Sequence, residues 1–200
     1  MKLLKIIEES LNERYIDIAV EALLDGNIII YPTDTLYALG CDALNNGAIE
    51  KICRIKGVKS EKTNLSIICE SISQVAEYAH FDNDEFRMMK ANLPGPFTFI
   101  FPAMSKLPKA FKGRKTVGVR VPDDKIAIEL VHRLGRPIMT SSIEYEDEDY
   151  GTEPELIAER YVGDVSLILD SGRRSIVPST IIDCTGDEPE IVREGKGVLK

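Results

Sequence analysis

Short apolar runs alternate with amphipathic segments along most of this chain. The runs at 27–31, 65–69, 97–101 and 116–121 are rich in Ile, Val, Leu and Phe, which is typical of buried strands. Further strand-like runs follow at 137–141, 165–170, 179–184 and 190–194. Helical periodicity predicts helices at 12–25, 46–56, 73–80, 84–93, 123–134 and 154–161. The alternation predicts an α/β protein with a mixed sheet flanked by helices.

Length and composition favour one domain over residues 1–200. Of the 200 residues, 44% are hydrophobic, which is enough for a core without disulfides or structural metal. The four cysteines form no CxxC pair, so we expect buried, reduced thiols. No apolar segment approaches the roughly 18 residues of a membrane span. The first residues show no signal-peptide cleavage pattern, so we expect a cytoplasmic protein.

The net charge of −8 argues against strong non-specific binding of nucleic acid. The charges are nevertheless unevenly spread. Residues 51–62 and 106–120 are basic, whereas 144–155 hold seven acidic and no basic residues. Each run can be a solvated face or a binding surface. Metal-centred hydrolysis is disfavoured, because His80 and His132 are the only histidines and lie on separate predicted helices.

Polar residues stand at the ends of several predicted strands, where α/β sheets commonly bind ligands. The segment YPTDTLYALGCD at 31–42 places Thr35 after a strand, and Gly40 allows close approach of the backbone. Thr98 lies in LPGPFTFIF, Ser142 ends MTSS, and PST contains Ser179. An ordinary strand-to-turn connection remains the alternative for each motif taken alone.

Three cations accompany these hydroxyls. Lys56 ends the apolar stripe of a predicted helix, and its side chain points either outward or into a cleft. Arg120 alternates with two valines in GVRVP, so it faces away from them and can bind a carboxylate or form a structural ion pair. Arg193 precedes two glycines in VREGKG. Together these motifs predict a cleft for an anionic, nucleotide-like ligand.

The ordered series PTDTLYALG, LPGPFTF, VGVRVP, TSS, PSTIID and VREGKG resembles the YrdC-like family over about residues 12–197. The resemblance implies a single three-layer YrdC/RibB-like α/β domain with a twisted mixed sheet and a large positive cleft. Synthases of this family join L-threonine, bicarbonate and ATP into threonylcarbamoyl-AMP for the t6A modification of tRNA. The resemblance also implies binding of double-stranded RNA.

The resemblance further implies roles for individual residues. Threonine contacts fall on Thr35, Arg120 and Thr140. Nucleotide contacts fall on the other cleft positions, namely Lys56, Thr98, Ser142, Ser179 and Arg193. Mg²⁺ is expected to accompany ATP on its phosphate oxygens. For RNA, the basic run supplies a candidate patch of Lys112, Arg114 and Lys115.

Two positions depart from the synthase pattern and are closer to the YciO branch. A Lys-x-Arg pair of the synthases reads Lys56-Gly57-Val58 here, and their Ser-x-Asn reads Ser142-Ile143-Glu144. Losing a cation and adding a carboxylate both weaken ATP binding. Two hypotheses follow: a threonylcarbamoyl-AMP synthase-like nucleotidyltransferase, and a non-catalytic protein that binds tRNA or double-stranded RNA in translation.

Overall fold

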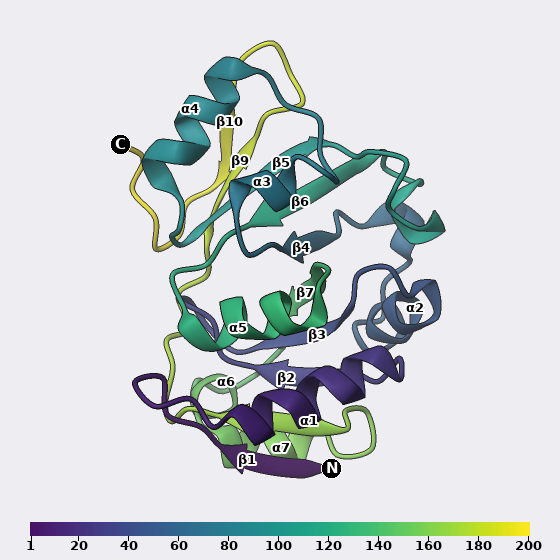
Figure 1. Cartoon of the computed structure of the whole chain (residues 1–200), viewed down its shortest axis with the longest axis vertical. Coiled ribbons are helices and arrows are strands. Elements are labelled where there is room, and N and C mark those ends of the chain that lie inside the picture. Colours follow the sequence, from purple (N-terminus) through teal and green to yellow (C-terminus); the bar gives the residue numbers. More distant parts are fainter.

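A single ten-stranded mixed sheet organises the computed structural model, which describes all 200 residues (Figure 1). Its strand order is β1-β8-β2-β3-β7-β4-β6-β5-β9-β10. The strands are β1 Lys2–Lys5, β2 Ile29–Tyr31, β3 Ala38–Asp42, β4 Ser66–Ile68, β5 Phe97–Pro102, β6 Thr116–Arg120, β7 Ile138–Ser142, β8 Leu167–Asp170, β9 Thr180–Asp183 and β10 Glu190–Arg193. The predicted α/β class with a mixed sheet is confirmed: β5 and β6, for example, are antiparallel, whereas β4 and β6 are parallel.

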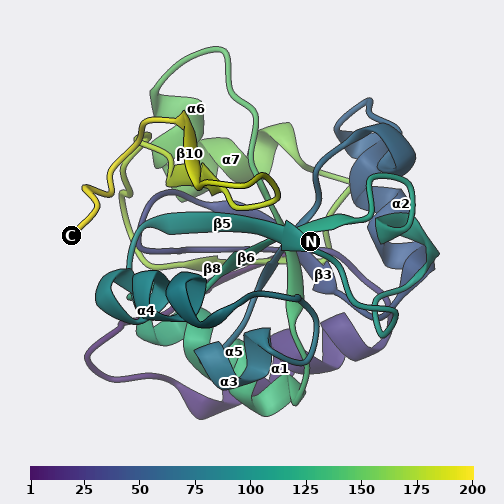
Figure 2. The ribbon, with the colours of Figure 1, turned by 90° about the horizontal axis from the view of Figure 1, so that it is seen from above.

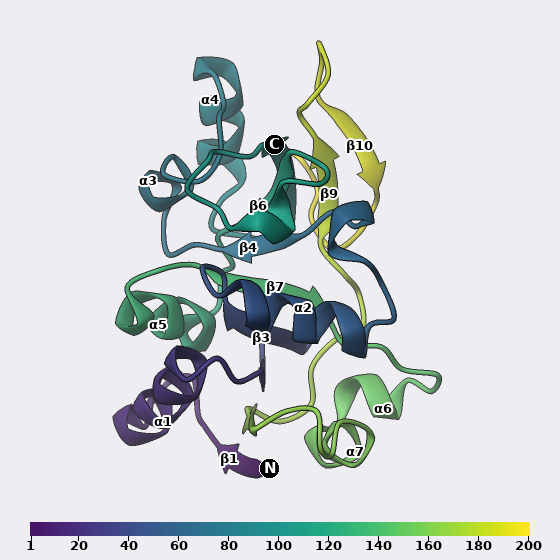
Figure 3. The ribbon, with the colours of Figure 1, turned by 90° about the vertical axis from the view of Figure 1, so that its right-hand side faces the viewer.

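Helices lie on both sides of this sheet. They are α1 Glu13–Leu24, α2 Asn46–Ile55, α3 Ile72–Val75, α4 Asn83–Asn92, α5 Lys125–Leu134, α6 Asp149–Thr152 and α7 Pro154–Arg160, with 3₁₀ turns η1 Ser60–Lys62 and η2 Lys109–Phe111. Figure 3 shows α1, α3, α4 and α5 on one side of the strands, with α6 and α7 on the other, and Figure 2 shows the same separation from above.

Alternation along the central strands explains why both faces are covered. Ile29 and Tyr31 of β2 belong to a core under α1 and α5, whereas Ile28 and Ile30 belong to a larger core on the opposite face. All four side chains are at most 3% exposed. Because successive side chains of a strand point to opposite faces, such a strand needs apolar partners on both sides.

Polar residues begin most of the helices where the sequence predicts. The Asn12 side chain accepts from the Tyr15 amide at the start of α1, and Asp124 caps α5 through the Ala127 amide. Gly135 ends α5 at a φ of 69°, in the left-handed region. The predicted helix at 73–80 is wrong in extent, because α3 ends at Val75.

Two strands and one helix differ from the sequence-based prediction. Residues 38–42, for which no strand was predicted, form the buried central strand β3, antiparallel to β2 and β7. This strand contains alanine, glycine and cysteine instead of an apolar run, so its pattern is inconspicuous. Strand β1 was not predicted, and the acidic segment contains α6.

The four cysteines are free and buried, as predicted. Burial raises the pKa of the Cys184 thiol to about 12, so this thiol stays protonated at neutral pH. No helix has the length and apolar character needed to cross a membrane.

Candidate functional site

Most of the predicted site residues line one cavity of about 170 Å³ among the strands. These are Thr98, Arg120, Thr140, Ser142, Ser179 and Arg193. They come from β5, β6, β7, β10 and the residue before β9, so segments far apart in the sequence converge. Ala38, Asn64, Ser66, Ser141 and Ile181 complete the lining. The structure thus brings six of the eight predicted cleft residues together, whereas Thr35 and Lys56 do not line this cavity.

Arg120 stands at the centre of a buried polar network. Its Nη2 donates to Asp34 Oδ1 at 2.7 Å and to Thr35 Oγ1 at 3.2 Å, and Arg120 is 6% exposed. Thr35 in turn shares a hydrogen bond with Thr33. The Arg120 Nε is buried and has no hydrogen-bond partner. A buried donor without a partner is costly, and a ligand oxygen would satisfy it.

Ser179 links the other side of the cavity. Its hydroxyl shares a 2.8 Å hydrogen bond with Thr98 Oγ1, and Arg193 donates to its carbonyl from Nε and Nη2. Burial, followed by the positive charge of Arg120, lowers the pKa of the Arg193 guanidinium. The two arginines thus lie close enough to repel, and an anion bound between them would relieve that repulsion.

Thr140 is positioned by a buried tyrosine. Tyr31 Oη donates to Thr140 Oγ1 at 2.9 Å, and burial raises the pKa of Tyr31, which keeps the phenol protonated as the donor. Gly40 lies against this ring, because a Cβ there would be 2.5 Å from Tyr31 Cε1. The motif suggested that Gly40 makes room for a ligand. In the structure, the glycine instead makes room for the aromatic ring of Tyr31.

Lys56 lies in a recess of about 60 Å³ that shares Asn64, Thr140 and Ser141 with the cavity. Of the two orientations that the sequence left open, the structure shows the one toward the cleft. The Lys56 ammonium donates to the Ser142 carbonyl at 2.9 Å and pairs with Glu144 at 3.0 Å. The carboxylate that departs from the synthase pattern thus neutralises this lysine directly. Val58 lines the same recess.

Sequence reasoning missed three polar residues of this region. Asp34 is the ion-pair partner of Arg120, and Asn64 and Ser66 line the cavity. Asp34 stands inside the PTDT motif beside Thr35, so its position in the sequence was available as a signal. Asn64 precedes the apolar run at 65–69 and Ser66 lies within it, so neither stands out from an ordinary strand.

The candidate RNA residues lie apart from the cavity. Lys112, Arg114 and Lys115 are exposed beside η2, and Arg114 donates to the Lys62 carbonyl of η1. The two basic runs therefore meet on one surface. Two residues of the 106–120 run are not part of this surface. Arg120 is buried in the cleft, where it pairs with Asp34, and Lys106 pairs with Glu77.

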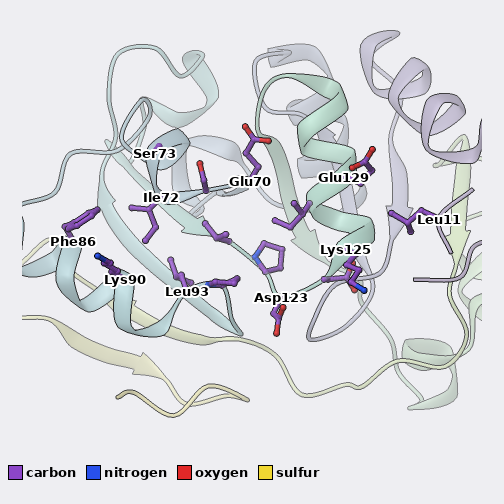
Figure 4. Close-up of a pocket in the computed structure, with 16 residues that line it drawn as sticks. Leu11, Glu70, Ile72, Ser73, Phe86, Lys90, Leu93, Asp123, Lys125 and Glu129 are labelled. Carbon is purple, nitrogen blue, oxygen red and sulfur yellow. The ribbon is translucent and has the colours of Figure 1, made fainter. Parts of the chain in front are cut away.

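A larger hollow of about 730 Å³ lies between α3, α4 and α5 (Figure 4). Its walls are mainly apolar, and acidic residues such as Glu70 and Glu129 accompany Lys90 and Lys125. None of the predicted cleft residues lines it. We therefore place the candidate site in the smaller polar cavity.

The residues of the cavity do not form a magnesium site of their own. Asp34 and Glu144 are the nearby carboxylates, and both are engaged by cations. No group of three or more His, Cys, Asp or Glu side chains is placed to hold a metal ion. Mg²⁺ demands near-octahedral oxygen coordination, so this chain alone does not supply it.

Hydroxyls and arginines converge on a cavity at the strand ends of a mixed sheet, and these features define the class: an α/β protein with a polar, arginine-lined cavity. The family model described as "Telomere recombination" (Sua5, YciO and YrdC) matches residues 21–195. The chain belongs to this Sua5/YciO/YrdC family, as the sequence motifs predicted.

Solved and curated relatives agree with this assignment. The crystal structure of Escherichia coli YciO matches with a TM-score of 0.92 and 38% identity, covering 100% of this chain and 98% of that one. Pyrococcus abyssi Sua5 complexed with L-threonine matches with a TM-score of 0.88 and 31% identity, covering 98% of this chain and 58% of that one. A Bacillus subtilis threonylcarbamoyl-AMP synthase is 32% identical over 96% of this chain and 56% of its own length.

Proposed function

We propose that this protein is a threonylcarbamoyl-AMP synthase-like nucleotidyltransferase that binds L-threonine and an adenine nucleotide in the cavity beside Arg120. Its reaction joins L-threonine, bicarbonate and ATP into threonylcarbamoyl-adenylate and releases pyrophosphate and water. The adenylate then serves the modification of tRNA. The observation that supports this proposal best is the convergence of Arg120 and Arg193 on one hydroxyl-lined cavity.

The threonine half of the proposal rests on Arg120. Its Nε is a buried donor without a partner, suited to a carboxylate oxygen. The Thr35 hydroxyl accepts from Arg120 Nη2, and Thr140 lines the same cavity. The similarity to a Sua5 structure that holds L-threonine supports the same substrate here.

The nucleotide half rests on Arg193, Thr98, Ser142 and Ser179, with Lys56 in the adjoining recess. Fixed donors of this kind position reactants and neutralise phosphate charge, which is most of what an adenylation requires of a protein. Mg²⁺ bound to ATP would neutralise part of the phosphate charge.

The test is release of pyrophosphate by the purified protein supplied with L-threonine, bicarbonate and ATP. We expect release that depends on threonine, and at least about a tenfold lower rate in Arg193→Gln. Arg14→Gln removes an equal charge from an exposed site and should leave the rate unchanged. No threonine-dependent release at high enzyme concentration would contradict the proposal.

A second candidate function, binding of tRNA or double-stranded RNA, is favoured by the surface on which the basic runs meet. We call Lys59, Lys62, Lys112, Arg114 and Lys115 the basic surface; all five are exposed. Gly113 lies against the backbone of Glu61, which brings the two segments into contact. Clustered cations bind phosphates with an affinity that falls as salt rises, and this salt dependence is the test.

A further inference from the structure

The cations of the cleft are largely neutralised by this chain's own carboxylates. Arg120 pairs with Asp34 at 2.7 Å, and Lys56 pairs with Glu144 at 3.0 Å. Arg193 has no carboxylate partner and donates only to Ser179. Of the three cations in the cavity and its recess, one therefore remains uncompensated.

The backbone of Glu144 is anchored from the core. Its amide donates to Tyr161 Oη at 2.8 Å, and the same phenol donates to its carbonyl at 3.3 Å. Tyr161 and the neighbouring Ile143 are 4% and 3% exposed. Buried contacts of Tyr161 and Ile143 thus fix the backbone of Glu144, from which the carboxylate reaches Lys56.

The Lys56 ammonium is a group suited to a phosphate oxygen, and here it is already paired with Glu144. The lysine side chain is only 18% exposed, and its remaining observed partner is the carbonyl of Ser142, a residue of the cavity wall. Glu144 itself lines neither the cavity nor the recess, so its carboxylate acts on a ligand there through Lys56, whose charge it neutralises.

We propose that Glu144 makes this cleft selective for a ligand with a single negative charge at phosphorus, an acyl or carbamoyl adenylate, over a nucleoside triphosphate. This inference rests on the proposed function, because it concerns the same cleft. The single phosphate charge of an adenylate is matched by Arg193. A triphosphate brings several charges, and it must either displace Glu144 from Lys56 or lie beside its carboxylate.

Calorimetric titration with two probes tests this selectivity. One probe is magnesium β,γ-methylene ATP, and the other is an N-acylsulfamoyl adenosine, a stable and singly charged mimic of an adenylate. We expect the wild-type chain to bind the sulfamate at least about tenfold more tightly than the triphosphate. Glu144→Gln should raise the affinity for the triphosphate about tenfold and that for the sulfamate much less.

Glu146→Gln is the matched control, because it removes an exposed carboxylate two residues away that forms no ion pair. Equal gains in Glu144→Gln and Glu146→Gln would show a general charge effect and overturn the proposal. So would a wild-type chain that binds both probes equally. Failure of the wild-type chain to bind the sulfamate at all would instead contradict the proposed function.

Discussion

Arg120 and Asp34 form a buried ion pair across the candidate site, with Nη2 and Oδ1 2.7 Å apart and both side chains 7% exposed. The carboxylate also accepts from the Asp123 amide through Oδ2, so it joins the loop after β2 to the loop after β6. The pair leaves Arg120 Nε free. Asp34 thereby holds in place an arginine that lines the cavity.

Breaking this pair should destabilise the protein. Asp34→Asn leaves the Arg120 charge buried without a partner, and we expect a loss of about 3 kcal/mol in the free energy of unfolding. Urea denaturation measures this loss. Asp123→Asn is the control, because it changes an exposed side chain and keeps the backbone amide that contacts Asp34. This variant should alter the free energy of unfolding by less than about 0.5 kcal/mol. Equal effects of both variants would contradict the importance of the pair.

Gly40→Ala should damage both stability and the site. The new Cβ would lie 2.5 Å from Tyr31 Cε1 and 3.0 Å from Ile138 Cγ2, so the buried ring must shift away from Thr140. We expect a loss of about 1–3 kcal/mol, measured by urea denaturation. Binding of L-threonine, measured by calorimetry, should weaken as well.

Gly47→Ala is the control for that substitution. Gly47 lies in α2, where an added Cβ would only reach ordinary contact distance, 3.4 Å from Asn45 Oδ1. Alanine in place of glycine in a helix should leave stability unchanged or raise it by up to about 1 kcal/mol. A Gly40→Ala variant as stable as Gly47→Ala would refute the steric role of Gly40.

Asp124 should give stability an unusual dependence on pH. Burial raises the pKa of this carboxyl to about 6, despite the helix cap that it forms and the nearby Arg174. Because the folded pKa lies above the unfolded one, the native state binds more protons between about pH 4 and 6. Its contribution to stability therefore falls as the pH rises through this window, by up to about 3 kcal/mol.

Asp124→Asn keeps a capping side chain and removes the titration. Urea denaturation from pH 4 to 8 should show that stability relative to wild type increases with pH up to about 6 and is constant above it. Asp164→Asn, at an exposed position with no ion pair, should follow the wild-type curve. Parallel curves for Asp124→Asn and wild type would contradict the raised pKa.

The basic surface should govern any binding of RNA. We expect Lys112→Gln, Arg114→Gln and Lys115→Asn together to weaken binding of double-stranded RNA and to flatten its dependence on salt. Asparagine is chosen because the φ of residue 115 is 58°. Filter binding over a range of salt concentrations measures both effects.

A control variant that lacks three cations elsewhere distinguishes an effect of the basic surface on RNA binding from an effect of the overall net charge. Lys2→Gln, Lys5→Gln and Arg14→Gln change the net charge equally at exposed positions distant in sequence from the basic surface. This triple variant should bind RNA with nearly the wild-type affinity, and its affinity should depend on salt concentration nearly as in wild type. If both triple variants lose affinity alike, the basic surface is not a specific contact.

The sequence alone determined the class of fold and most members of the site. Apolar runs such as 27–31 and 97–101 favour buried strands, and side-chain alternation then sets which residues face each core. The motifs around Thr35, Arg120, Ser142, Ser179 and Arg193 identified the family. Local pattern was insufficient for β3, whose small residues show no apolar run and whose pairing depends on strands distant in the sequence.

Only the tertiary structure decided how the charges are paired. Asp34 meets Arg120 and Glu144 meets Lys56 across separations of 86 and 88 residues in the chain, and no local rule relates such positions. The contact of η1 with η2 likewise unites two basic runs into one surface, while Arg120 is withdrawn into the cleft. Electrostatic interactions depend on distance and burial in space, so a sequence supplies the charges but their partners follow from the fold.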